Sequence, residues 1–159
     1  MMERIAVFPG SFDPFTVGHE SIVLRGLDLF DRIIVAIGQN TTKHNRFSVE
    51  QRIRMVQEIF ANEPRVEVAA FEGLTVDFCR SINATFILRG LRTSADFEFE
   101  RAIGQMNKMM NDNIETVFLL TSTSHTPINS SIVREIIQNS GDVTPFIPKS
   151  LDIQKYLKE

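Results

Sequence analysis

The sequence predicts an α/β fold with a doubly wound parallel sheet. Short apolar runs, long enough for buried strands and too short for helices, alternate along the chain with segments of helical spacing. A polar cluster follows most of these runs, and ligands of doubly wound sheets bind outside the carboxyl ends of the strands. No internal repeat, low-complexity segment or linker interrupts the chain, which predicts a single domain over residues 1–159.

The first strand, turn and helix are expected to create an anion site. A strand over Ile5–Phe8 is expected to stop at Pro9–Gly10, because proline lacks a ladder donor and glycine admits unusual backbone angles. A helix with one apolar face is expected from Gly18. Its N-terminus presents unpaired N–H groups, and both Ser11 and His19 can face an anion there.

The remaining elements continue the alternation. Four further strands are expected over Arg32–Ile37, Val66–Ala70, Thr85–Leu88 and Thr116–Leu120, the last as a central strand. Helices are expected after Ser48, which forms a capping-box signature with Gln51, over Leu74–Ile82, over Ser94–Asn111 with Ser94 as cap, and after Ser130 or Ser131. In the helix after Ser94, the residues expected to face inward are Phe97, Ile103, Met106 and Met110. Gly141 is expected to end the helix after Ser131, and Ser150 to cap a short terminal helix.

Composition excludes several classes of protein. The formal net charge of −3 argues against nucleic-acid and membrane-surface partners, which usually require a basic protein. No apolar run approaches the roughly 18 residues of a transmembrane helix, and the early first strand leaves no room for a signal peptide. The single cysteine, Cys79, lies among apolar residues and is expected to be a core thiol. A cytoplasmic location is therefore expected.

Four polar clusters are expected at one edge of the sheet: Ser11–His19, Gln39–Arg46, Arg89–Arg92 and Thr121–Ser131. His19 can donate to a phosphate oxygen at the helix N-terminus, although a lone histidine there is more often a surface or capping residue. Lys43 follows the second strand and can neutralise phosphate, whereas a loop lysine taken alone is usually only solvated.

Charged residues after the strand that ends at Leu88 form a second group of candidates. Arg89 and Arg92 can bind phosphates bidentately, and the Gly90 between them allows close backbone approach. The alternative is a left-handed turn with two exposed arginines. Asp96 and Glu100 share a helix face and could form a metal site, but a solvated acidic face is the commoner outcome.

The run Ile128–Arg134 indicates a second anion pocket. Serines that open a helix after a buried strand offer backbone N–H groups and hydroxyls to an anion. Arg134 is expected one turn further on, over that pocket. An ordinary helix cap accounts for one serine of the run and leaves the others unexplained.

Together these motifs resemble those of a known family. Gly10–Pro14 followed by Thr16–His19 is similar to the signature of nucleotidyltransferases that carry a (His or Thr)-x-Gly-His motif. Ile128–Arg134 resembles their second signature, Ile-Ser-Ser-(Thr or Ser)-x-x-(Arg or Lys). With Arg89–Arg92 followed by Asp96–Glu100, the whole chain resembles the bacterial phosphopantetheine adenylyltransferases. The departures are Asn129, where the family usually has serine, Ser11 in place of the commoner threonine, and the run His125-Thr126-Pro127.

The resemblance implies a Rossmann-like nucleotidyltransferase fold and a reaction. ATP and phosphopantetheine would give dephospho-coenzyme A and pyrophosphate, with Mg²⁺ as cofactor and a homohexamer, a dimer of trimers, as assembly. It implies ATP contacts for Ser11, Phe12, His19, Gly90, Leu91, Arg92, Glu100, His125, Thr126, Pro127, Ile128, Asn129, Ser130 and Ser131. It implies phosphopantetheine contacts for Ser11, Lys43, Thr75 and Arg89, and catalytic roles for His19, Lys43, Arg92 and Ser130.

The implied chemistry needs no general base. The attacking phosphate has a second pKa of about 6 and is largely dianionic at neutral pH. In-line positioning and electrostatic stabilisation without a covalent intermediate are therefore expected. Two alternatives remain: another small nucleotidyltransferase, acting on nicotinamide mononucleotide or a polyol phosphate, and a non-catalytic nucleotide-binding module. Thr75 and Arg89 favour pantetheine, and a mere sensor would not need His19 and Lys43 together.

Overall fold

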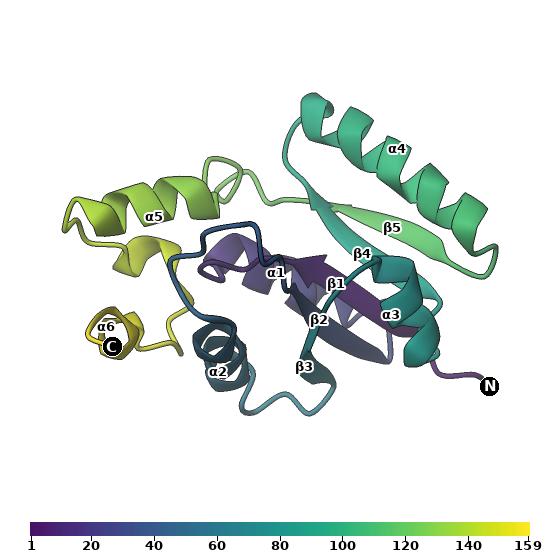
Figure 1. Ribbon diagram of the computed structural model, residues 1–159, viewed down its shortest axis with the longest axis horizontal. Coiled ribbons are helices and arrows are strands. Elements are labelled where there is room, and N and C mark those ends of the chain that lie inside the picture. Colours follow the sequence, from purple (N-terminus) through teal and green to yellow (C-terminus); the bar gives the residue numbers. More distant parts are fainter.

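A single parallel sheet organises the chain. The computed structural model describes residues 1–159, and its five strands lie in the order β3-β2-β1-β4-β5. The strands are β1 (Ile5–Gly10), β2 (Arg32–Gly38), β3 (Val66–Phe71), β4 (Phe86–Leu91) and β5 (Glu115–Leu120). All neighbouring pairs are parallel. From β1 the strands are added on one side as β2 and β3, and the chain then crosses back to add β4 and β5 on the other side (Figure 1). The doubly wound α/β fold predicted from the sequence is therefore confirmed, with its switch point between β1 and β4.

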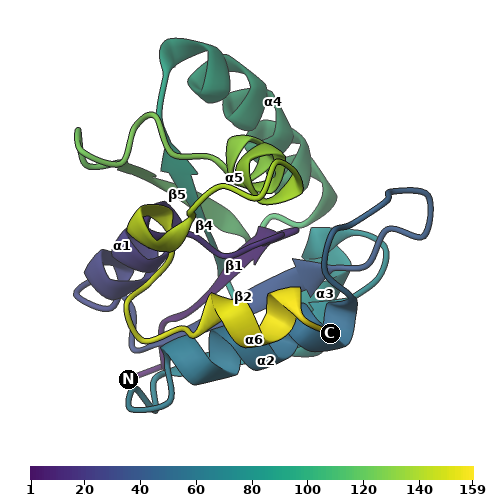
Figure 2. The same ribbon diagram turned by 90° about the vertical axis from the view of Figure 1, so that its left-hand side faces the viewer.

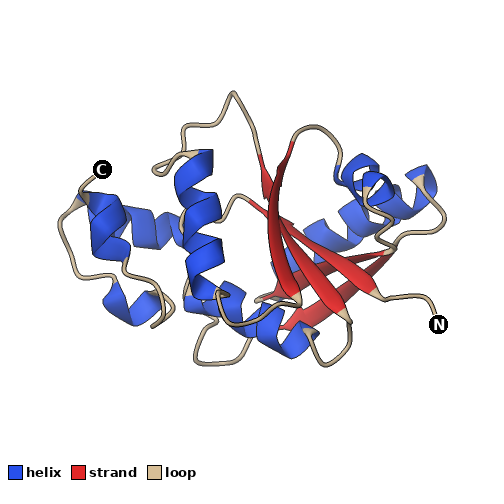
Figure 3. Cartoon of the chain, turned by 90° about the horizontal axis from the view of Figure 1, so that it is seen from below, coloured by secondary structure: helices blue, strands red, loops and turns tan.

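Helices cover both faces of the sheet (Figure 3). They are α1 (Val17–Gly26), α2 (Val49–Ile59), α3 (Thr75–Ser81), α4 (Ser94–Met110), α5 (Ser130–Gln138) and α6 (Ile153–Leu157), with a short 3₁₀ turn, η1 (Thr144–Phe146). Alternate residues of β1 point to opposite faces: Ala6 and Phe8 belong to the large core shared with α1 and α2, and Ile5 and Val7 to a smaller core with α3. At the C-terminus, α6 lies beside α2, where the hydroxyl of Tyr156 donates to Glu58 (Figure 2). No helix is both long and apolar enough to cross a membrane.

The strands extend further than predicted. β1 continues through Pro9 and Gly10, which pair with Ala36 and Ile37 of β2. The carbonyl of Pro9 points away from β2 and accepts a hydrogen bond from the guanidinium of Arg89. Because the N and C=O of one strand residue point to the same side, the missing N–H of Pro9 falls where pairing with β4 has already ended, after Val7. A proline at this point therefore costs the sheet no hydrogen bond.

Three predicted helix caps are wrong by one to two residues. The observed N-caps are Thr93 for α4, Asn129 for α5 and Asp152 for α6, in place of Ser94, Ser130 or Ser131, and Ser150. A cap must combine a non-helical backbone with a side-chain oxygen that reaches an N–H group further along. Threonine, asparagine and aspartate can do this as well as serine, so the presence of a serine alone does not locate the cap. The capping box of Ser48 and Gln51 is confirmed.

The end of α5 also differs from expectation. The helix ends at Gln138, and the residue in the left-handed region is Ser140, with φ of 59°. Gly141 is needed for another reason: a Cβ atom there would lie 2.6 Å from Cγ2 of Ile136. Close approach to the helix, rather than backbone angle, therefore explains the glycine.

The helix α4 does not bury the residues predicted to face inward. β5 is an edge strand rather than a central one, so α4 covers only the rim of the sheet and has no buried residue. Phe97, Ile103, Met106 and Met110 are between 39% and 57% exposed, and Phe99 and Met109 are more exposed still. Phe97 does face the sheet as predicted, because its ring packs edge-on against that of Phe118 in β5. The face as a whole is not buried, because helical periodicity identifies an apolar face without showing what covers it. Cys79, by contrast, is fully buried, and burial raises the pKa of its thiol to about 11, as expected of a core residue.

Candidate active site

Two adjoining cavities lie at the carboxyl ends of the central strands. The first, of about 340 Å³, is lined by the β1–α1 loop, the start of α5, and Lys43, Arg89 and Arg92. The second, of about 270 Å³, lies between β4, β5, α4 and the start of α3, and contains Thr75. Both share a wall made of Pro9, Gly10, Ser11, Arg89 and Glu100. The cavities meet at the switch point, where sheets of this kind bind ligands.

Most of the candidate residues line these cavities. The first cavity brings together Ser11, Phe12, His19, Lys43, Arg89, Gly90, Arg92, Glu100 and Ile128–Ser131. Leu91 and the run His125–Pro127 do not line it. Leu91 is buried, and His125 lines a separate surface hollow with Glu20 and Lys149.

His19 is held in one tautomer by the first turn of α1. The backbone N–H of Thr16 donates to Nδ1 of His19 over 3.0 Å, and the N–H of His19 returns a contact of 3.4 Å to the Thr16 hydroxyl. Since a backbone N–H can only donate, Nδ1 is an acceptor and the proton of the neutral ring lies on Nε2. The ring also packs against Phe12 and Phe15. His19 is thus a rigid donor through Nε2.

The surroundings of His19 keep the ring uncharged. Burial is the main cause, followed by the positive charges of Arg89 and Arg92, and together they lower the pKa of His19 to about 3. At neutral pH the side chain is therefore a neutral hydrogen-bond donor rather than a cation. It can bind an anionic oxygen without contributing a charge of its own.

Arg89 and Arg92 occupy different positions because β4 extends to Leu91. A Cβ on Gly90 would lie 3.0 Å from Ile22 of α1, so Arg89, its neighbour in the strand, points to the opposite face. The guanidinium of Arg89 binds both carboxylate oxygens of Glu100, at 2.9 and 2.7 Å, on the wall between the cavities. Arg92 lines only the first cavity. The two arginines therefore face different volumes, although they follow the same strand.

The acidic pair on α4 is engaged by these arginines. Glu100 is only 12% exposed and its carboxylate is occupied by Arg89, so it does not belong to a solvated face. Asp96 accepts from the backbone N–H of Arg92 through Oδ2, at 3.2 Å. No group of three or more His, Cys, Asp or Glu side chains is arranged to hold a metal ion. Of the carboxylates that line the first cavity, Asp13 and Glu100 have both oxygens engaged, and Asp96 has Oδ1 left for a metal ion.

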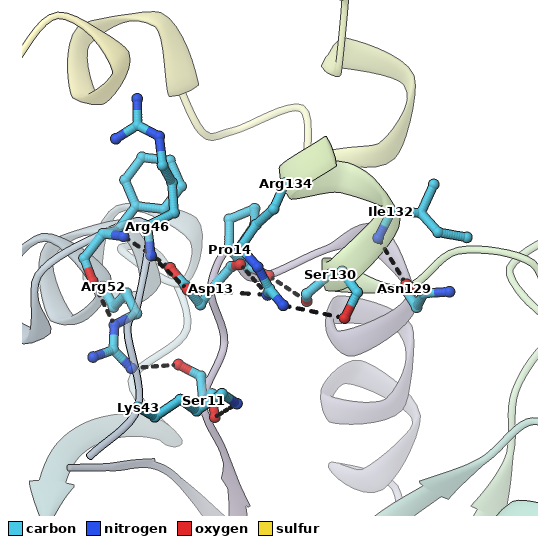
Figure 4. A network of polar contacts seen from close by, with 12 residues as sticks. Ser11, Asp13, Pro14, Lys43, Arg46, Arg52, Asn129, Ser130, Ile132 and Arg134 are labelled. Carbon is cyan, nitrogen blue, oxygen red and sulfur yellow. Dashed lines mark hydrogen bonds and ion pairs between the residues drawn. The ribbon is translucent and has the colours of Figure 1, made fainter. Parts of the chain in front are cut away.

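The start of α5 closes the first cavity. The hydroxyl of Ser130 donates to the carbonyl of Pro14 at 2.8 Å, which ties α5 to the β1–α1 loop. The side chain of Asn129 caps the helix through the N–H of Ile132. Arg134 donates to the carbonyl of Asp13 at 2.8 Å and to the hydroxyl of Ser131 at 3.1 Å (Figure 4). It lines the first cavity, as predicted from its place one turn into the helix.

Two charged residues were not identified from the sequence. Asp13 and Arg52 are each 1% exposed, and both hold the loops of the first cavity. The carboxylate of Asp13 accepts from the backbone N–H groups of Arg46 and Phe47, at 2.8 and 2.9 Å (Figure 4). A signal for Arg52 was present, because it shares the apolar face of α2 with Met55, where a charged residue is unusual.

Comparison with known proteins agrees with the geometry. Residues 7–136 match the cytidylyltransferase-like family. A bifunctional nicotinamide-mononucleotide adenylyltransferase/ADP-ribose pyrophosphatase from Francisella tularensis superposes with a TM-score of 0.73, covering 99% of this chain and 49% of that one, at 18% identity. At that identity the likeness concerns the fold alone. With the cationic cleft at the switch point, the family match defines the protein as a nucleotidyltransferase.

Proteins with similar sequences show to which family of nucleotidyltransferases the chain belongs. The phosphopantetheine adenylyltransferase of Flavobacterium psychrophilum is 51% identical over 95% of this chain and 99% of its own length. That of Phocaeicola vulgatus is 47% identical over 94% of this chain and 99% of its own. The chain belongs to the phosphopantetheine adenylyltransferase family.

The low pKa of His19 predicts acid sensitivity of the fold. An unfolded histidine takes up a proton near pH 6.5, whereas the folded ring does so only near pH 3. Between these values the unfolded state binds more protons, so the free energy of unfolding falls as the pH falls, by up to about 1.4 kcal/mol per pH unit. In His19→Asn this part of the slope should be absent. Urea unfolding at pH 4.5 and 7 measures it.

The same substitution at exposed His44 is the matched control. A slope that is unchanged in His19→Asn, or lost equally in both variants, would contradict the assignment.

Proposed function

We propose that this protein transfers the adenylyl group of ATP to phosphopantetheine, giving dephospho-coenzyme A and pyrophosphate. The observation that carries the proposal is the pair of cavities that share a wall at Ser11 and Arg89. One cavity can take a nucleotide, and the other can take an elongated substrate whose terminal phosphate reaches the shared wall. The names of the relatives support this choice of substrates.

Electrostatic positioning is sufficient for this chemistry. The attacking phosphate is already largely dianionic at neutral pH, so it needs no base. Lys43 reaches the shared wall, where its ammonium lies 3.1 Å from the Ser11 hydroxyl, and can neutralise the two phosphates as they approach. His19 can donate from Nε2 to an oxygen of the reacting α-phosphate, and Arg92 can stabilise the leaving pyrophosphate. We infer in-line attack without a covalent intermediate.

The nucleotide is assigned to the first cavity. The N-terminus of α5, with Asn129, Ser130 and Ser131, offers N–H groups and the positive end of the helix dipole to its phosphates. The hydroxyl of Ser130 already donates its proton to the carbonyl of Pro14. Ser130 would therefore contribute to phosphate binding through its backbone N–H. Asn129 retains the cap of α5, which preserves this N-terminus although the family usually has serine there.

We propose that Mg²⁺ enters with ATP. The shortage of free carboxylates suits an ion that keeps several waters and binds mainly to substrate phosphates. Of the chain's residues, Asp96 would be its contact, through the oxygen not engaged by Arg92. When bound, the ion would neutralise phosphate charge.

A substrate panel tests the proposed activity. With ATP as donor, we expect rapid pyrophosphate release with phosphopantetheine and little with nicotinamide mononucleotide or a polyol phosphate. In His19→Ala, kcat should fall by roughly two to four orders of magnitude while the affinity for ATP changes little, because the lost bond strengthens in the transition state. No turnover with any acceptor, despite ATP binding, would favour the non-catalytic nucleotide-binding module instead.

The two arginines should separate the substrates. Arg89 borders both cavities, whereas Arg92 borders only the first. Arg89→Ala should therefore weaken the binding of phosphopantetheine, and Arg92→Ala should weaken the binding of ATP. Loss of an arginine–phosphate contact is typically worth about 1.5–3 kcal/mol, or roughly tenfold to over a hundredfold in dissociation constant. Calorimetric titration of each ligand into each variant decides the matter. Equal weakening of both ligands by both variants would mean a single diffuse positive patch.

We further propose a homohexamer, a dimer of trimers, as in the family resemblance. The support is the group of exposed apolar side chains on α4, among them Phe99, Met106 and Met109, together with Leu120. Exposed apolar patches mark sites of protein–protein interaction. Met109→Glu, at a residue 78% exposed, should reduce the assembly by placing a charge in the interface. Sedimentation measures the mass of both forms, with Leu24→Glu on the outer side of α1 as control. A wild-type monomer would refute the proposal.

A further inference from the structure

The loop that carries Lys43 is fixed at one end by buried charges. Of the residues between β2 and α2, Lys43 lines the first cavity, and the last part of this loop lies against the β1–α1 loop. Asp13 accepts the N–H groups of Arg46 and Phe47, so one carboxylate joins the two loops. The second link is made by Arg52, in the first turns of α2.

Arg52 holds three carbonyl groups from within the core. Its Nη1 donates to the carbonyl of Ser11 at 2.7 Å (Figure 4). Its Nε donates to the carbonyls of Phe47 at 3.1 Å and Ser48 at 3.3 Å. The rigid planar fork of a guanidinium fixes the separation of the groups that it binds, which an ammonium on a flexible stem does not do.

Arg52 is separated from the reacting groups by one residue. It lines neither cavity and is 1% exposed, so no substrate can touch it. The connection runs through Ser11: its carbonyl accepts a hydrogen bond from Arg52, and its hydroxyl accepts one from the ammonium of Lys43. A buried guanidinium is costly to desolvate, and here burial is the leading cause that lowers its pKa. An uncharged methionine would fill a similar space without that cost, so the charge at this position needs an explanation other than packing.

We propose that Arg52 is a positioning residue for adenylyl transfer, which acts through Ser11 to keep the ammonium of Lys43 at the junction of the two cavities. The inference rests on the proposed function, because it assumes that Lys43 serves the reaction. Small displacements of a group that stabilises charge are expensive: a shift of about 1 Å can cost a hundredfold in rate. Arg52 should therefore control the rate more than the affinity for nucleotide.

Two variants and a matched control test this role. In Arg52→Met we expect kcat to fall by about ten- to a hundredfold with the KM for ATP changed less than about threefold. Arg52→Lys should recover part of that loss, because the charge beside Asp13 remains while the fork is absent. Arg54→Met, two positions along α2 at an exposed arginine bound to Glu159, should keep the wild-type rate. Assays are run well below each melting temperature, which is measured by circular dichroism.

A double-mutant cycle with Lys43→Ala distinguishes positioning from general stability. If Arg52 acts through Lys43, the Arg52→Met/Lys43→Ala double variant should be no more than about threefold slower than Lys43→Ala alone. Multiplicative losses, an unchanged kcat in Arg52→Met, or an equal loss in Arg54→Met would overturn the proposal. Unfolding of both Arg52 variants at the assay temperature would also overturn it, since Arg52 would then be required for folding. Wild type is assayed first, so an inactive wild type refutes the proposed function and an active one isolates the test of Arg52.

Discussion

The carboxylate of Asp13 is the contact on which the rest of the site depends. It is buried, it accepts two backbone N–H groups from the neighbouring loop, and the carbonyl of the same residue is bound by Arg134 of α5. Three segments far apart in the sequence therefore meet at one residue. Removal of either partner of a buried charged contact leaves the other without compensation, which makes this arrangement costly to disturb. The loop that carries Lys43 and the helix α5 are therefore both anchored to the β1–α1 loop at this residue.

The cleft itself follows from the strand order. β1 pairs with β4 only at Ala6 and Val7, while its pairing with β2 continues to Gly10. The strands on either side of the switch point therefore diverge, and the gap receives the guanidinium of Arg89 rather than a backbone ladder. A cationic group on a strand, held by Glu100 and by the Pro9 carbonyl, is positioned more rigidly than one on a loop.

Local signals predicted the fold well and the supports of the site poorly. The strands, the capping box of Ser48 and the sheet edge that collects His19, Lys43, Arg89 and Ser130 all follow from patterns within a few residues. The contacts of Asp13 with the Lys43 loop, and that of Arg52 with the Ser11 carbonyl, join residues more than thirty positions apart, and no local spacing encodes them. The prediction that the apolar face of α4 is buried was wrong for a similar reason, because periodicity describes a helix and not its neighbours. The sequence predicted that Pro9 would end the first strand. It lies within the strand because the hydrogen bonds with β4 end before it, which is a property of the whole sheet.

The tautomer of His19 has a consequence for how the protein responds to its surroundings. Because Thr16 occupies Nδ1 and the ring stays uncharged, this histidine keeps a single protonation state throughout the range of pH in which cells live. A phosphomonoester changes its charge within that same range. Near neutral pH the pH dependence of the rate would then come from the incoming phosphate rather than from His19, whose low pKa affects the stability of the fold under acidic conditions. In this range of pH the charge of the attacking phosphate changes, whereas that of His19 does not.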